Sequence, residues 1–127
     1  MKIKRDLVAV GALHTGLGVA LGAFAAHALR DRIAPDLLEI FKTGVLYQQI
    51  HGLALLGTAA AAEILGERKT VVVGALFQIG IFIFSGSLYA LALTGTRWLG
   101  AITPLGGVAF LGAWLTMFLA ALKKSEA

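Results

Sequence analysis

The sequence predicts an all-α integral membrane protein that folds as a four-helix bundle, and three observations lead to this prediction. Hydrophobic residues make up 58% of the 127 residues, and the mean hydropathy is +0.85, more than a soluble core of this size can bury. Charged residues make up only 14% and fall at the ends of apolar runs, as they do in membrane proteins. Four of these runs are long enough to cross a bilayer as helices. We therefore expect residues 1–127 to form one transmembrane domain.

The four expected spans are separated by short polar stretches. They cover residues 7–26, 45–65, 71–93 and 101–122. The first run is longer than the apolar core of a signal peptide, so we expect it to be retained. Before the second span, Pro35 suits the first turn of a helix, and Leu37, Phe41 and Val45 recur at a helical spacing of four. This pattern predicts a short amphipathic segment that runs into the second span as one long helix.

Basic residues beside the spans indicate how the chain lies in the membrane. Four spans place both termini, and the turn between spans two and three, on one side. That side holds seven basic residues and the other side holds four. The seven are Lys2, Lys4, Arg5, Arg68, Lys69, Lys123 and Lys124, and the four are Arg30, Arg32, Lys42 and Arg97. Because basic residues are enriched on the cytoplasmic side, we expect cytoplasmic termini.

Several classes of partner and chemistry are excluded by composition. The net charge of +4 does not point to nucleic acid, because the sequence has neither a long basic stripe nor aromatic residues interleaved with it. The chain has no cysteine, which excludes disulfides and thiolate metal sites. His14, His27 and His51 would suggest haem only with matched ligand pairs, which the sequence lacks. We therefore expect no metal, no cofactor, no catalytic residue and no enzyme. The expected partners are the lipid bilayer and a second copy or another membrane protein.

Strongly polar side chains in or beside the spans are the candidate site residues. They are His27, Tyr47, Gln48, His51, Gln78, Ser85 and Tyr89. The candidates of span two are expected to project from one side of their helix. In span three, Gln78 and Ser85 are seven residues apart and Ser85 and Tyr89 are four apart, which predicts that all three share one helix face. All but Gln78 lie in the half away from the termini, and Gln78 lies deeper, where it would floor a cavity. The cluster is either a polar pocket or proton relay, or a set of side chains hydrogen-bonded across helices.

Small residues at two places are expected to permit close helix packing. Gly18 and Gly22 are four residues apart in span one, and Ala26 continues the same stripe. Gly106 and Gly107 follow a proline at the start of span four. They predict either a broken helix that exposes backbone groups to a ligand or a tight turn that lets helices pack closely.

Motifs in all four spans resemble those of a known family. Span one ends on Gly22-Ala23-Phe24-Ala25-Ala26-His27, and span two contains Tyr47-Gln48 with His51. Span three contains Phe84-Ser85-Gly86-Ser87-Leu88-Tyr89, and span four contains Thr103-Pro104-Leu105-Gly106-Gly107 with Gly112 and Trp114. With these residues the chain resembles the small four-helix membrane proteins of unknown function that include bacterial YgdD and eukaryotic transmembrane protein 256. Ala25 departs from the family pattern, which more often has glycine there. The resemblance implies an integral inner-membrane protein and brings no established activity, substrate or catalytic residue.

Two functional hypotheses follow. The first is a non-enzymatic membrane protein that serves as an assembly, partner-binding or membrane-organising component, because the chain has almost no mass outside the spans. The alternative is a small oligomeric transporter or channel. Its polar path would run between helices two and three, near Gln48, His51, Gln78 and Ser85.

Overall fold

The computed structural model describes residues 1–123, and every regular element in this range is helical. The elements are α1 (Lys2–Phe24), η1 (Ala25–Leu29), α2 (Pro35–Ala60), α3 (Ala62–Leu65), α4 (Glu67–Gly80), η2 (Ile81–Ser85), α5 (Gly86–Thr94), η3 (Arg97–Ala101) and α6 (Thr103–Leu122). Of these, η1 and η2 are π-helices and η3 is a 3₁₀-helix. The prediction of an all-α fold is therefore confirmed. Lys124, which was counted above for the topology, lies outside the described residues.

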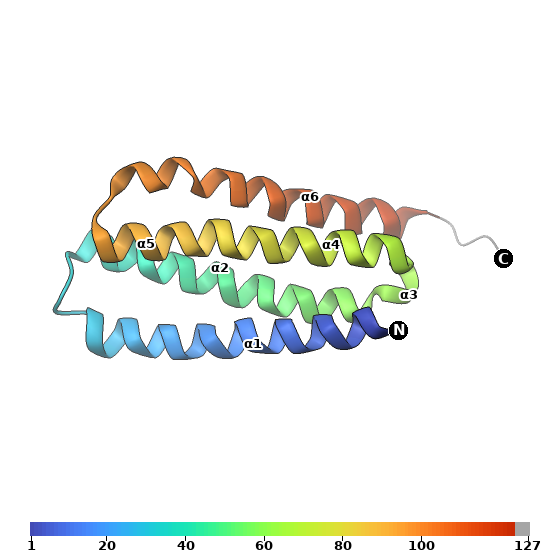
Figure 1. The fold of residues 1–127 in the computed structure, drawn as a ribbon, viewed down its shortest axis with the longest axis horizontal. Helices are drawn as coiled ribbons and strands as arrows, with labels where there is room; N and C mark the ends of the chain where they lie inside the picture. Colours follow the sequence, from blue (N-terminus) through green and yellow to red (C-terminus); the bar gives the residue numbers. More distant parts are fainter. Residues whose placement is uncertain (124–127) are drawn as a thin grey trace.

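The elements join into long rods that lie side by side (Figure 1). The continuous rods are Lys2–Leu29, Glu67–Thr94 and Arg97–Leu122, and α2 makes up most of another. α2 packs along α1 and against α4 and α5, whereas α6 packs along α4 and η2. The start of α1, the end of α6 and the short helix α3 lie at one end of the molecule (Figure 1). The connections from η1 to α2 and from α5 to η3 lie at the opposite end.

The three continuous rods are also the ones that are long and apolar enough to cross a membrane, among the residues that the structure describes. They match the first, third and fourth expected spans. The second expected span lies in α2, which does not meet the same criterion. α2 begins at Pro35, as the sequence predicts, and runs unbroken to Ala60. Its middle carries Gln48, Gln49 and His51, and these polar side chains lower its hydropathy.

Glycines allow α1 and α2 to approach closely. A Cβ atom at Gly11 would lie 2.7 Å from the backbone oxygen of Gly52, and one at Gly52 would lie 2.5 Å from Thr15 Oγ1. Neither position could carry a side chain without a shift of the neighbouring helix. Because lipid is as apolar as the helix surfaces, such close packing is a main source of helix association in membranes. Gly11 and Gly52 therefore fix this crossing.

A π-turn in the third rod changes which residues share a helix face. Gln78, Ser85 and Tyr89 are expected on one face if the helix is regular. Instead η2 inserts a π-helix at Ile81–Ser85, where hydrogen bonds span five residues and each residue turns the helix less. As a result Gln78 contacts α1, whereas Ser85 and Tyr89 contact α2. The expectation of a single face is wrong for this physical reason.

Glycines shape the loops at the two ends of the molecule, and exposed ion pairs link the elements beside these loops. Gly66 and Gly95 have φ values of 77° and 71°, positive values that glycine adopts without steric cost. At the end near α3, Lys4 pairs with Glu63. At the opposite end, Arg97 Nη2 lies 2.6 Å from Asp36 Oδ2. Exposed pairs such as these contribute little to stability, typically about 0 to 1 kcal/mol.

Candidate functional site

Four buried or half-buried side chains form one hydrogen-bonded set, which we call the polar network. Its members are His14 of α1, Gln48 of α2, Gln78 of α4 and Tyr89 of α5. The Tyr89 hydroxyl donates to Gln48 Oε1 across 2.6 Å. Gln48 Nε2 lies 3.4 Å from His14 Nδ1 and 3.3 Å from the backbone oxygen of His14. On the far side of the imidazole, His14 Nε2 lies 2.8 Å from Gln78 Oε1. The polar network thus ties α1 and α2 to the rod formed by α4, η2 and α5.

The proton positions in the polar network follow from which atoms can donate. Because the phenol of Tyr89 donates to Gln48 Oε1, the NH₂ group of Gln48 must face His14. An amide nitrogen only donates, so His14 Nδ1 accepts and carries no proton. The ring proton then sits on Nε2 and is donated to Gln78 Oε1. Both ring nitrogens of His14 are thus paired.

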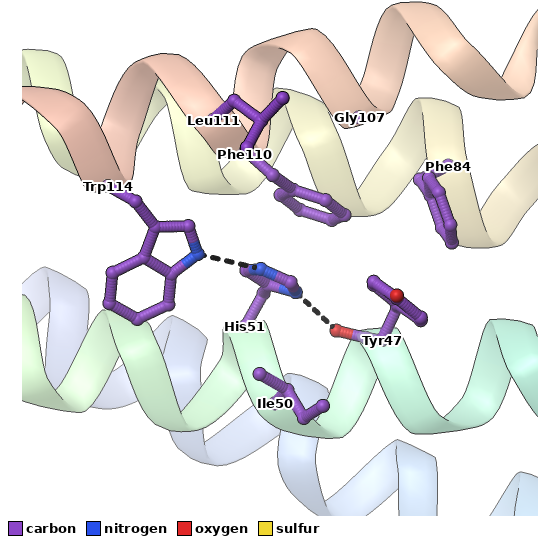
Figure 2. A pocket seen from close by; sticks show the side chains of 8 residues that line it. All are labelled: Tyr47, Ile50, His51, Phe84, Gly107, Phe110, Leu111 and Trp114. Atoms are coloured by element: carbon purple, nitrogen blue, oxygen red, sulfur yellow. Dashed lines mark hydrogen bonds between the residues drawn. The ribbon is translucent and has the colours of Figure 1, made fainter.

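His51 lies outside the polar network, among aromatic rings between α2 and α6 (Figure 2). Its ring stacks on Phe110, with centroids 3.5 Å apart and planes 4° from parallel. Trp114 Nε1 donates to His51 Nε2 across 3.1 Å, and His51 Nδ1 lies 2.8 Å from the backbone oxygen of Tyr47. An indole N–H can only donate, so His51 Nε2 accepts and the ring proton sits on Nδ1. His51 is therefore neutral in the opposite tautomer to His14.

The space beside His51 is a cavity of about 420 Å³, which we call the aromatic groove. It is lined by Tyr47, Ile50, His51, Phe84, Gly107, Phe110, Leu111 and Trp114. α2 supplies one wall and α6 the other, and Phe84 of η2 lies between them (Figure 2). The groove lies beside this contact because the backbone of α6 packs mainly along α4 and η2, and α6 reaches α2 through side chains such as Phe110 and Trp114. Its rim carries exposed apolar side chains, among them Ile50 and Leu111.

The predicted candidates of α2 are divided between these two places. Tyr47 and His51 are one helical turn apart and face α6, where their rings stack with centroids 5.8 Å apart. Gln48 is one position on from Tyr47, and it faces α1 and α5. One residue of an α-helix turns by about 100°, which is enough to send adjacent side chains to different neighbours. The structure therefore does not bring the three to one side of the helix.

Two other predicted candidates lie apart from the polar network and the aromatic groove. The hydroxyl of Ser85 donates to the backbone oxygen of Gly44 across 2.7 Å, which ties η2 to α2. His27 is exposed in η1, near the end of the first rod. Gln78, which was expected to floor a cavity, hydrogen-bonds to His14 and lines a separate pocket between α1 and α4.

The predicted packing glycines occupy three kinds of surroundings. Gly18 is covered by the side chain of Gln49, and Gly106 lies against η2, where a Cβ would be 2.5 Å from the backbone nitrogen of Phe84. Gly22 makes only ordinary contact, with Val45 Cγ1 3.5 Å from the position of a Cβ. A Cβ at Gly107 would meet no atom within 4 Å. Gly107 therefore opens onto the aromatic groove and does not lie at a helix crossing.

Neither His14 nor Trp114 is among the site residues that the sequence predicts. Both lie in the middle of a strongly apolar helix. A polar N–H group there needs a partner, because the hydrocarbon offers none. The position of His14 and Trp114 in the middle of an apolar helix could therefore have identified both as candidates from the sequence. In the part of the chain that the structure describes, no three His, Asp or Glu side chains are placed to hold a metal ion.

Comparison with known proteins places this chain in a family. The family model described as "Protein of unknown function (DUF423)" matches residues 21–107. The chain is 44% identical to UPF0382 membrane protein YwdK of Bacillus subtilis strain 168, over 91% of this chain and 95% of that protein. It is 44% identical to a UPF0382 membrane protein of Staphylococcus epidermidis, over 91% and 94% of the two chains.

A more distant relative is UPF0382 inner membrane protein YgdD of Escherichia coli strain K12. It is 36% identical to this chain, over 94% of this chain and 91% of that protein. No solved structure matches the chain significantly. The names of these relatives and the three apolar rods agree that this is a membrane protein, and the resemblance found from the sequence motifs is confirmed. The chain belongs to the DUF423 family of membrane proteins, whose biochemical role is unknown.

Proposed function

We propose that this protein is a non-enzymatic component of the inner membrane that works by binding a partner within the plane of the bilayer. The observation that carries the proposal is the use of its internal polar groups. The imidazole nitrogens of His14 and His51 and the amide of Gln48 are all bonded to other groups of the protein. Most of these bonds join different helices, which is the structural use of polar side chains in membrane bundles.

The proposal includes a fourth span formed by α2. Its 26 residues correspond to about 39 Å of helix, more than the roughly 30 Å hydrocarbon core. Of the three polar side chains that lower its hydropathy, Gln48 and His51 are only 5% and 4% exposed, and Gln49 is half-buried. Gln48 and His51 are both hydrogen-bonded inside the protein, which removes most of the cost of placing them in a membrane.

Four spans place both termini on one side, and the distribution of basic residues favours the cytoplasm. The chain has no native cysteine, so single cysteines report their own position. Lys2→Cys, near the start of α1, is expected to react with a membrane-impermeant maleimide only after the membrane is opened. Thr96→Cys, in the connection before η3, is expected to react in intact cells. The reverse pattern would overturn the orientation, and labelling of both positions on one side would overturn the fourth span.

The lateral surface is where a partner would bind. Outside the helices, residues 1–123 contain only short connections, whereas α6 presents Leu115 and Phe118 with more than half of each side chain exposed. A photo-crosslinking amino acid at Leu115 tests this surface directly, and one at the fully buried Phe77 serves as the control. The proposal predicts a discrete protein adduct at Leu115 and none at Phe77. Adducts to lipid alone, from Leu115 and from Phe118, would contradict it.

The alternative, a small oligomeric transporter or channel, is favoured by one observation. The polar network is a continuous series of hydrogen-bonded groups from Tyr89 through Gln48 and His14 to Gln78. In this alternative His14 is the residue that would pass a proton along the series, because glutamine amides do not titrate. In liposomes, a proton flux that disappears on His14→Leu and persists on His27→Leu would establish this function. The same proton flux from both variants, or no flux at all, would rule out this alternative function.

A further inference from the structure

The aromatic groove has flat walls and lies near the middle of its helices. The rings of Tyr47 and Phe84 are tilted by 33° with centroids 4.5 Å apart, and the centroids of Phe84 and Phe110 are 5.5 Å apart. Tyr47 is the thirteenth of the 26 residues of α2 and Trp114 the twelfth of the 20 residues of α6. Aromatic faces of this kind favour another flat ring in an offset or edge-to-face arrangement. The groove is thus suited to a planar group that arrives from the hydrocarbon.

One hydrogen-bond donor in the aromatic groove is unused. The N–H of Trp114 is donated to His51, and the N–H of His51 is donated to the backbone of Tyr47. For the hydroxyl of Tyr47, in contrast, no hydrogen bond is found within residues 1–123, although Tyr47 lines the groove and is half-buried. A phenol hydroxyl inside the membrane without a hydrogen-bond partner costs free energy, because hydrocarbon offers no acceptor for its hydrogen bond. A ligand with one acceptor oxygen would complete it.

The groove also has room and access. Its volume of about 420 Å³ lies in the range of pockets that hold small organic ligands, roughly 300 to 1,000 Å³. Gly107 contributes to this space, since a Cβ there would touch nothing within 4 Å. At the rim, Leu111 is 69% exposed and Ile50 is 42% exposed. A ligand dissolved in the membrane could therefore enter sideways, between α2 and α6.

We propose that the aromatic groove binds a lipid-soluble quinone, with a carbonyl oxygen accepting a hydrogen bond from the Tyr47 hydroxyl and the ring lying against the half-buried Phe84. A phospholipid acyl chain fits this site less well, because its ester oxygens lie at the membrane interface and the chain itself has no acceptor at this depth. Partner binding at the exposed face of α6 does not require this ligand site, and quinone binding does not depend on a protein partner.

Trp114 provides a reporter inside the site. The only other tryptophan is Trp98 in η3, so Trp98→Phe leaves one indole at the groove. In nanodiscs, a benzoquinone with a decyl chain is expected to quench this Trp114 fluorescence along a saturable curve. Quinone that is merely dissolved in the bilayer would quench in proportion to its concentration and would not saturate.

Two matched glycine variants locate the quinone. Gly107→Leu fills the groove and is expected to abolish the saturable part of the quenching, and Gly107→Ala is expected to weaken binding. Gly57→Leu places the same side chain on an open surface of α2, where a Cβ also meets nothing within 4 Å, and is expected to bind like the parent. Equal quenching curves for Gly107→Leu and Gly57→Leu, with helical circular dichroism intact, would overturn the site.

Tyr47→Phe tests the recognition of a carbonyl group. Loss of one neutral hydrogen bond is expected to weaken binding about twofold to tenfold, while the aromatic face stays in place. Unchanged affinity in Tyr47→Phe would mean that the groove takes any apolar chain, such as the acyl chain of a lipid. That result would overturn the proposal of a quinone even if saturable binding were observed.

Discussion

Replacing Gln48 by methionine is expected to destabilise the fold more than the same change one residue later. Gln48 makes one short bond, from Tyr89 across 2.6 Å, and two long ones to His14. Hydrogen bonds between membrane helices contribute about 0.6 kcal/mol on average and about 1.7 kcal/mol at most. Gln48→Met also leaves the Tyr89 hydroxyl and His14 Nδ1 unpaired, and an unpaired buried group costs about 1 to 3 kcal/mol. We therefore expect a loss of about 2 kcal/mol in the free energy of unfolding, or about thirtyfold in the equilibrium constant.

The assay is reversible unfolding in mixed micelles by titration with a denaturing detergent. Gln49→Met is the matched control, because Gln49 covers Gly18 with its methylene groups and methionine keeps a similar unbranched shape. Its expected cost is below about 0.5 kcal/mol. A double-mutant cycle of Gln48→Met with Tyr89→Phe should show a coupling of about 1 kcal/mol. Equal losses for Gln48→Met and Gln49→Met would refute the structural role of the polar network.

Two further predictions concern a helix crossing and an end of the fold. Gly106→Ala is expected to lower stability by about 1 to 3 kcal/mol, because its Cβ would lie 2.5 Å from the backbone of Phe84, whereas Gly107→Ala should be neutral or raise stability by up to about 1 kcal/mol. Equal effects in the same detergent titration would contradict the packing of α6. At the exposed end of α2, the hydrogen bond from Arg97 lowers the pKa of Asp36 below its ordinary value. The ion pair is therefore fully formed at a pH above the ordinary pKa of Asp. It is lost as the pH falls through the lowered pKa of Asp36. Arg97→Gln should return the Asp36 pKa toward the ordinary value by carboxyl NMR, and no change would contradict the contact.

The extent of the helices could be predicted because it depends on local features of the sequence. Pro35 marks the start of α2, and charged or glycine-containing turns separate the apolar runs. The expected spans at 7–26 and 71–93 lie inside the rods Lys2–Leu29 and Glu67–Thr94. The hydropathy of the sequence identifies only the residues that lie in the hydrocarbon core of the membrane, whereas the helices continue beyond this core into the polar connections. The rods are therefore longer than the spans that hydropathy identifies.

The pairing of polar side chains could not be predicted from helical spacing alone. The sequence suggested His14 as an axial ligand or as an ionisable group of a transporter, whereas it joins Gln48 and Gln78 because three helical rods meet at that point. The π-turn at η2 sends Gln78 toward α1, and its sequence, Ile-Phe-Ile-Phe-Ser, carries no local signal for such a turn. Which face of one helix meets which face of another is decided by packing over the whole molecule.

The central claim is that the internal histidines are hydrogen-bonded struts and do not line a water-filled path. Nitrogen NMR of ¹⁵N-labelled histidine rings in lipid nanodiscs, at about pH 8 where an unperturbed ring is neutral, tests it most directly. The structure predicts one tautomer for each ring, with the proton of His14 on Nε2 and that of His51 on Nδ1. His27, which is exposed, should show the averaged signals of a ring in water and serves as the internal control. Averaged signals for His14 and His51 as well would show that water reaches them, and would contradict the account.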